Sequence, residues 1–434
     1  MQQTPPTPVQ SGASADIGAD PPNPRDRPEG PAKPWIVAIV FGLALMVTSG
    51  LHALPSRPLA AWVVPLLWLW GGLVVLGARR APSLPVVLLA AAVLRALFVG
   101  TPPWLSDDLY RYLWEGLAWR HGYAPLYDPP SSIEGLAPDL RAQVTHGHLP
   151  SVYPPLAMSW FALLSTLGGT VAVAQGATAL MDLLTVTALH RWRPSMAWLY
   201  ALHPVAVLES AAGAHIDIVA IALAAAAVAI VPAGPARVLG LWAGGLTKLF
   251  PFVAVPTALR ALPLPQAVPT VVAALAATAL LAAPHVRLDI PPGLVAYGTH
   301  WSFNGFAWTW VHPVLGTATR PVLVGLGALV GVVTLLRRTD PVVVWRDVAA
   351  AFVLLSPTLH PWYVLWVVVP DLLLGQRRWA AASVALAGSY LVLGTFDPAD
   401  GTWAEAPWLW WVTWGPALVA LGAYPFRDDS PTAP

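Results

Sequence analysis

Apolar runs of about 20 residues, separated by shorter polar intervals, follow one another along the chain from residue 35 onward. A helix of that length spans the hydrocarbon core of a bilayer, because each residue adds about 1.5 Å of rise. We expect about 11–13 apolar segments of this kind. Their approximate positions are 35–54, 59–78, 84–100, 156–190, 194–231, 237–260, 266–284, 315–336, 347–375, 377–396 and 407–424. The pattern predicts an all-α, polytopic transmembrane helical bundle over residues 34–426.

Prolines and glycines interrupt three of these segments. Segment 156–190 is too long for one span and contains two adjacent glycines, so we expect a half-membrane helix followed by one span. Segment 237–260 carries two prolines, which predicts a broken or re-entrant hairpin with Lys248 near its apex. Segment 347–375 is expected to be a broken helix pair, because two prolines also lie at its centre.

Basic residues cluster in short loops, which the positive-inside rule assigns to the cytoplasm. These clusters are Arg79 with Arg80, Arg337 with Arg338, and Arg377 with Arg378. Counting the crossings from them places both termini inside and leaves two long external loops, at 101–154 and 285–313. Residues 1–33 are expected to be a disordered tail and 427–434 a short cytoplasmic tail. The expected location is a bacterial plasma (inner) membrane, with the first external loop structured.

Composition narrows the function further. The chain is 56% hydrophobic and only 10% charged, so the lipid bilayer is an expected partner. A net charge of +1 gives no indication of the excess of basic residues that nucleic-acid binding requires. The absence of cysteine excludes thiol catalysis, cysteine-ligated metals and disulfides.

The first external loop opens with the sequence Ser-Asp-Asp-Leu-Tyr-Arg-Tyr-Leu-Trp-Glu-Gly. If this stretch is helical, Ser106 is its N-cap, and Asp107 and Asp108 share a face with Arg111. Glu115 lies two turns after Asp108 on the same stripe. A capped interfacial helix with a local ion pair is one interpretation, and a general base at the water boundary is the other. Adjacent carboxylates also suit a divalent cation, but too few further oxygen ligands are evident to assign a metal site.

Ionisable residues also occur at membrane depth, where each costs about 3 kcal/mol unless it is paired or hydrated. They include Glu209, His215, Asp217, Lys248 and His360. Each has a structural interpretation: the lysine can snorkel, the acids can pair with a base, and a histidine before proline can bond a freed carbonyl. The crossings, however, place them near the external face with the two aspartates. Such convergence is what an external, membrane-embedded active site needs.

That site suits transfer from a lipid-linked donor. A carboxylate at the water boundary can take the proton of an acceptor hydroxyl as it attacks. Lysine, arginine and histidine deeper in the groove can stabilise a phosphate that leaves on a polyprenyl carrier.

Several motifs carry a resemblance to a known family. SDDLYRYLWEG, HGYAPLY and HLPSVYPPLA resemble the first external loop of bacterial integral-membrane glycosyltransferases of the GT-C superfamily. The most similar group is the polyprenyl-phosphate-mannose-dependent mannosyltransferases. HPVAVLESAAGAHID, LTKLFP, HWSFNG and LSPTLHPWY match further motifs in the same order, so the resemblance extends over 104–366. Ile216 and His203 stand where that group has asparagine, which is compatible with a changed sugar or acceptor.

The resemblance implies a hexosyltransferase of GT-C type that moves mannose, as the first expectation, from a polyprenyl-phosphate-linked donor to a hydroxyl of a glycan or glycolipid acceptor. It implies that Asp108 or Asp107 is the general base, with Asp108 slightly favoured. The implied donor-binding residues are Arg111, Lys248, His360, Tyr363 and Tyr153. The implied pocket-shaping residues are Glu115, Glu209, His215, Asp217, His300 and Asn304. No cofactor is implied, although a divalent metal stays open.

Two alternatives belong to other classes of protein. A transporter or flippase for a lipid-linked glycan predicts two related halves, and no internal repeat is evident in the sequence. An O-antigen-ligase-like glycan transferase predicts an arginine-rich external loop, whereas 285–313 holds only Arg287.

Overall fold

The computed structural model describes residues 34–54, 56–78, 82–283, 290–397 and 402–423. Within these ranges the chain is helical, and its β pairing is limited to isolated bridges such as that between Phe303 and Thr358. The all-α prediction is therefore confirmed. The two tails expected at the ends of the chain lie outside the described residues, as do Arg79, Arg80 and Arg287.

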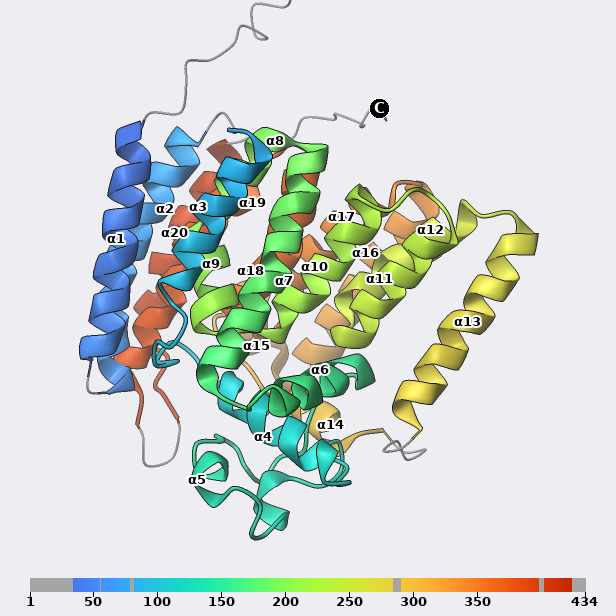
Figure 1. Cartoon of the computed structure of the whole chain (residues 1–434), viewed down its shortest axis with the longest axis horizontal. Coiled ribbons are helices and arrows are strands. Elements are labelled where there is room, and N and C mark those ends of the chain that lie inside the picture. Colours follow the sequence, from blue (N-terminus) through green and yellow to red (C-terminus); the bar gives the residue numbers. More distant parts are fainter. Residues whose placement is uncertain (1–33, 55, 79–81, 284–289, 398–401, 424–434) are drawn as a thin grey trace, which may run out of the picture. The chain divides into compact units, whose positions relative to one another are not determined.

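The helices occur in the following order. The first half contains α1 (Pro34–Ala53), the 3₁₀ helix η2 (Arg57–Val63), α2 (Val64–Gly77), α3 (Leu84–Ala96), α4 (Asp108–Arg120), η3 (Pro130–Ser132), α5 (Pro138–Arg141), α6 (Pro155–Thr166), α7 (Val171–Trp192), α8 (Pro194–Ala201), α9 (Pro204–Val207) and the π-helical η4 (Leu208–Ala212). The second half contains α10 (Ile216–Ala229), α11 (Pro235–Thr247), η5 (Phe250–Ala254), α12 (Val255–Arg260), α13 (Leu264–Ala282), α14 (Pro292–His300), α15 (Phe306–Leu315), η6 (Gly316–Ala318), α16 (Thr319–Arg337), α17 (Pro341–Leu355), α18 (Pro361–Leu373), α19 (Arg378–Leu386), η7 (Ala387–Thr395) and α20 (Pro407–Ala423). Helices α1, α2, α3 and α7 run alongside one another, and α4, α5, α6 and α14 gather at one end of them (Figure 1).

Among the described residues, five helical stretches are long and apolar enough to cross a membrane. They are Pro34–Ala53, Arg57–Gly77, Val171–Trp192, Leu264–Ala282 and Phe306–Arg337. A sixth results if α9 with η4 and α10, which meet at a bend of 117°, count as one broken span. Fewer long apolar helices are present among the described residues than the 11–13 segments expected, because several apolar segments form shorter helices such as α3, α6 and α18. A helical protein with apolar, membrane-compatible helices is what the fold supports.

The interruptions expected from proline and glycine are present. Gly168 and Gly169, both with positive φ, separate the short helix α6 from the 22-residue helix α7, as predicted. Lys248 is extended, with φ −151° and ψ 134°, directly after the end of α11. A further break separates Leu355, where α17 ends, from Pro361, where α18 begins.

A buried ion pair joins α3, α7 and α8. The Arg95 guanidinium donates to Asp182 through Nε at 2.8 Å, and the two side chains are 1% and 0% exposed. Tyr200 donates its hydroxyl to the other Asp182 oxygen at 2.7 Å, and Arg95 Nη1 donates to the carbonyl of Ala201 at 3.0 Å. Because both charges are paired and hydrogen-bonded, this group holds the three helices together without an uncompensated buried charge.

α4 packs on α6 at a contact that only glycine permits. A Cβ atom at Gly116 would lie 2.1 Å from the carbonyl oxygen of Phe161, which is a backbone atom and cannot rotate away. Gly116→Ala is therefore expected to lower the free energy of unfolding by about 1–3 kcal/mol, measured as an earlier thermal transition in detergent. Gly42→Ala in α1, where nothing lies within 4 Å of the added atom, is the matched control. Equal stability of the two variants would contradict the close contact.

Candidate functional site

A cavity of about 550 Å³ lies among α4, α14, α18 and η7. The predicted residues that line it are Asp107, Asp108, Arg111, Tyr153, Lys248, His360 and Tyr363. Most other lining side chains are apolar or aromatic, among them Phe250, Phe352 and Trp366. Motifs that are up to about 250 residues apart in the sequence therefore meet in space.

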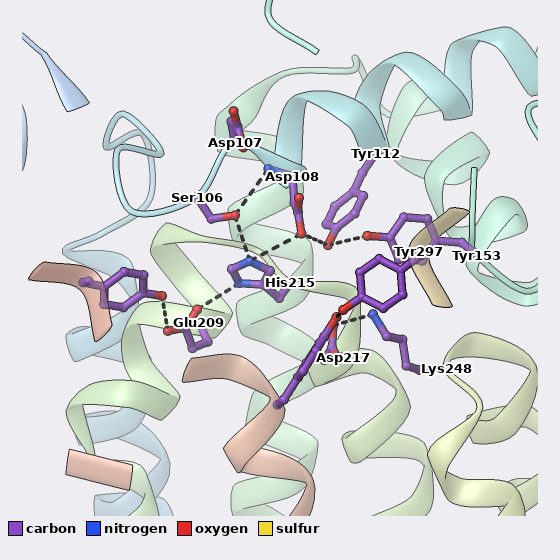
Figure 2. Close-up of polar contacts among 12 residues, drawn as sticks. Ser106, Asp107, Asp108, Tyr112, Tyr153, Glu209, His215, Asp217, Lys248 and Tyr297 are labelled. Carbon is purple, nitrogen blue, oxygen red and sulfur yellow. Dashed lines mark hydrogen bonds and ion pairs between the residues drawn. The ribbon is translucent and has the colours of Figure 1, made fainter. Parts of the chain in front are cut away.

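Asp108, the first residue of α4, points toward Tyr112 and His215 (Figure 2). Its Oδ2 lies 3.5 Å from the Tyr112 hydroxyl and 4.0 Å from His215 Nε2. The side chain is 34% exposed, and it lines the cavity. Burial is the largest influence on the pKa of the Asp108 carboxyl and raises it, the charge of His215 opposes this rise, and the charge of Asp107 adds to it. A carboxyl that reaches the cavity and has a raised pKa is suited to accept a proton.

Asp107 points away from His215 and has a different partner (Figure 2). Its Oδ2 accepts a hydrogen bond from Arg57 Nη1 at 2.7 Å, and the Arg57 guanidinium also lies 4.6 Å from the ring centre of Phe396. The local ion pair expected with Arg111 is not the one formed, because Arg57 reaches the aspartate from η2. Sequence reasoning missed Arg57. The loop between segments 35–54 and 59–78 is external by the crossing count, so an arginine there is an exception to the positive-inside rule and could have been noticed for that reason.

The start of α4 also differs from the prediction by one residue. Asp107, not Ser106, occupies the N-cap position, and its side chain makes no capping hydrogen bond. Ser106 Oγ instead accepts the Asp108 N–H at 3.4 Å and lies 3.2 Å from His215 Nε2. Ser106 therefore connects the aspartate to the histidine rather than capping the helix.

Lys248 lies in a cage of aromatic rings and does not extend toward solvent. Its Nζ donates to Asp217 Oδ2 at 3.2 Å and lies 5.0, 5.4 and 6.0 Å from the ring centres of Tyr153, Tyr363 and Trp366. Trp366 also donates its indole N–H to the other Asp217 oxygen at 2.7 Å. The ammonium is thus fixed at the cavity wall by one buried carboxylate and three π faces. This arrangement replaces the snorkelling interpretation.

His215 and Glu209 lie behind the cavity wall and are fully buried. His215 Nδ1 lies 2.9 Å from Glu209 Oε2, and Tyr390 donates its hydroxyl to Glu209 Oε1 at 2.5 Å. The histidine ring stacks on Trp362 at 3.9 Å, and Trp362 also stacks on His360 at 4.4 Å. His360 is therefore part of the aromatic wall.

Arg111 and Glu115 hold the 145–151 loop on α4. Arg111 donates to the carbonyls of Thr145 and His146 at 2.9 Å and to Glu115 Oε1 at 3.1 Å. Glu115 is fully buried and accepts the Ser151 hydroxyl at 2.8 Å. These contacts give Arg111 a structural task at the cavity edge in addition to the donor contact expected of it.

None of the six predicted pocket-shaping residues lines this cavity. Glu115, Glu209, His215 and Asp217 each contact a residue that does, whereas His300 and Asn304 lie elsewhere. His300, at the end of α14, is exposed and lies 3.2 Å from the carbonyl of Ala296. Asn304 is buried, with φ +49°, and its Oδ1 accepts the Thr413 hydroxyl at 3.0 Å. Asn304 lies instead at a second, tryptophan-rich cavity of about 470 Å³. Among the cavity residues that sequence reasoning did not assign to the site are Arg57, Tyr297, Trp362, Trp366 and Tyr390.

No group of three or more His, Asp or Glu side chains is arranged to hold a metal ion in the part of the chain that the structure describes. Comparison with known proteins gives no match: no family model, no curated protein and no solved structure is similar to this chain. The functional conclusion therefore rests on the motifs and on the geometry of the cavity.

Proposed function

We propose that this protein is a membrane-embedded glycosyltransferase of GT-C type that moves a hexose, with mannose as the first candidate, from a polyprenyl phosphate to a hydroxyl of a glycan or glycolipid. The observation that carries the proposal is a partly exposed aspartate that shares a largely apolar cavity with a caged lysine. The aspartate is suited to take the proton of an acceptor hydroxyl, and the lysine is suited to bind a phosphate. The apolar lining suits the first isoprene units of the carrier.

The reaction proposed is a single displacement at the anomeric carbon. Asp108 takes the proton of the acceptor hydroxyl while the acceptor oxygen attacks that carbon. The bond between the anomeric carbon and the phosphate oxygen breaks, and its electrons stay on the leaving polyprenyl phosphate. Lys248 lies where it can stabilise that added charge, and its fixed position limits the reorganisation needed in the transition state.

Transfer can be tested directly with the purified protein. Radiolabelled polyprenyl-phosphate mannose is incubated with a panel of glycan and glycolipid acceptors, with and without a chelator. We expect label to move to at least one acceptor and its anomeric configuration to invert, because one displacement reverses the configuration. A protein that transfers no sugar from several polyprenyl-phosphate hexoses, but moves a lipid-linked glycan across vesicles, would instead be the flippase.

The cellular setting is part of the same proposal. Both termini are proposed to lie in the cytoplasm of a bacterium, with the cavity open to the external face of the plasma membrane. A cysteine introduced in the 121–124 turn after α4 should then react with a membrane-impermeant maleimide in intact spheroplasts. Labelling only after the membrane is permeabilised would reverse the orientation.

A further inference from the structure

A chain of contacts connects Asp108, through the buried side chains of His215 and Glu209 behind the cavity wall, to Tyr390, which also lines the cavity. Asp108 lies 4.0 Å from His215, His215 lies 2.9 Å from Glu209, and Tyr390 donates to Glu209 from η7. His215, Glu209 and Tyr390 come from the N-cap of α10, from η4 and from η7. Figure 2 shows His215 between the two carboxylates, with one ring nitrogen toward each.

The backbone conformation between Glu209 and His215 brings the two side chains together. The π-helical turn η4 ends at Ala212, and Ala214 adopts a left-handed conformation with φ +50°. A Cβ atom at Gly213 would lie 2.6 Å from the His215 ring, so glycine is required there. The backbone N–H of His215 also donates to the backbone carbonyl of Glu209 at 2.9 Å. Backbone strain of this kind persists where the surrounding structure stabilises it, and it is common at functional sites.

We propose that His215, held as a cation by Glu209, is a positioning residue that keeps Asp108 ionised and directed toward the acceptor. This inference rests on the proposed function, in which Asp108 is the base. A purely structural ion pair between His215 and Glu209 would need no second carboxylate nearby. Here Nε2, the nitrogen opposite Glu209, faces Ser106 Oγ at 3.2 Å and Asp108 beyond it.

Neighbouring contacts fix the plane of the His215 ring. Trp362 stacks on one face at 3.9 Å with an angle of 16° between the planes. Ser106 Oγ accepts a hydrogen bond from the Asp108 N–H, and its remaining lone pair can accept a second one from His215 Nε2–H. Nδ1, on the other side of the ring, lies 2.9 Å from the Glu209 carboxylate, so a doubly protonated imidazole faces a carboxylate on one side and Ser106 Oγ on the other.

The electrostatic consequence follows from the groups around Asp108. Burial favours the neutral carboxyl, and a cation 4.0 Å away favours the carboxylate. The charged and titratable groups that interact with Asp108 or His215 are Asp107, Arg111, Tyr112, Glu115, His146, Tyr153, Glu209, Asp217, Lys248, Tyr297, His360 and Tyr390. Among its charged neighbours, His215 has the largest lowering effect on the pKa of Asp108. Loss of the histidine charge should therefore raise the pH at which Asp108 ionises.

The experiment measures Asp108 ionisation and sugar transfer in the same variants. The carbonyl stretch of protonated Asp108 is followed by infrared difference spectroscopy from pH 3 to pH 9 and is assigned by its absence in Asp108→Asn. In His215→Gln the midpoint should rise by about one pH unit or more, and the acid limb of the transfer rate should move with it. Glu209→Gln, which removes the charge that holds the imidazolium, should shift both in the same direction.

His203→Gln is the matched control. His203 is also a fully buried histidine before a helix, but its Nε2 bonds the carbonyl of Ala380 at 3.0 Å and does not face the cavity. Its variant should leave both midpoints unchanged. Unshifted midpoints in folded His215→Gln and Glu209→Gln, or an equal shift in His203→Gln, would overturn the inference. Because the infrared midpoint does not depend on catalysis, a wild-type protein that transfers no sugar would refute the proposed function separately.

Discussion

Asp108→Asn is expected to lose sugar transfer by about 10²–10⁴-fold while keeping its fold. Asparagine has the same shape as aspartate, so the cavity and the contact with Tyr112 are preserved, but the amide cannot take the proton of an acceptor hydroxyl. The loss should appear in kcat rather than in the affinity for the donor, because the donor contacts are expected at Lys248. Initial rates with radiolabelled polyprenyl-phosphate mannose, together with a thermal transition in detergent, measure both properties.

Asp107→Asn is the matched control for that loss. Asp107 is bound to Arg57 at 2.7 Å, and it points away from His215, so it is poorly placed to serve as the base. We expect its variant to retain transfer within about tenfold of wild type, because a partly exposed ion pair contributes little to the site. An active Asp108→Asn variant beside an inactive Asp107→Asn variant would exchange the two roles. Wild-type rates in both would remove the proposed base.

The grouping of the site residues could be predicted from the sequence because it depends only on the order of apolar segments and basic clusters along the chain. Under the positive-inside rule, arginine clusters are expected on one side of the membrane, and counting crossings from them predicts that Asp108, Lys248 and His360 lie together. All three line one cavity. The helix breaks were predictable for a similar reason, since proline and glycine act on the backbone at their own positions. Features that depend on residues close together in the sequence can therefore be predicted without a structure.

Partnerships between distant side chains could not be read in that way. The pairing of Asp107 with Arg57 and that of Glu209 with Tyr390 each join elements that are far apart in the sequence, and nothing local favours those partners over others. The division of apolar segments into short packed helices such as α3, α6 and α18 could not be predicted either, because hydropathy does not reveal where a segment is divided. Asn304 was misplaced because its neighbours in the motif line the main cavity, whereas its own side chain turns toward Thr413.

Lys248→Met is expected to have the second large effect, about 10²–10³-fold in transfer, because one preorganised cationic donor contributes that much to a developing negative charge. The same change leaves Asp217 buried without its cation, which costs about 3–5 kcal/mol of stability. A lower transfer rate in this variant alone could therefore result from the lost phosphate contact or from the loss of stability. The thermal transition in detergent should fall together with the transfer rate.

A double variant separates the two effects of losing Lys248. Lys248→Met combined with Asp217→Asn removes both charges, so the uncompensated carboxylate disappears and the thermal transition should return toward that of the wild type. Asparagine can still accept the indole N–H of Trp366, which keeps that contact at the cavity wall. If the lysine binds the leaving phosphate, transfer stays low in the stable double variant, and Asp217→Asn alone loses much less. Recovery of both stability and transfer in the double variant would instead make Lys248 a structural partner of Asp217 and move the phosphate to another part of the cavity.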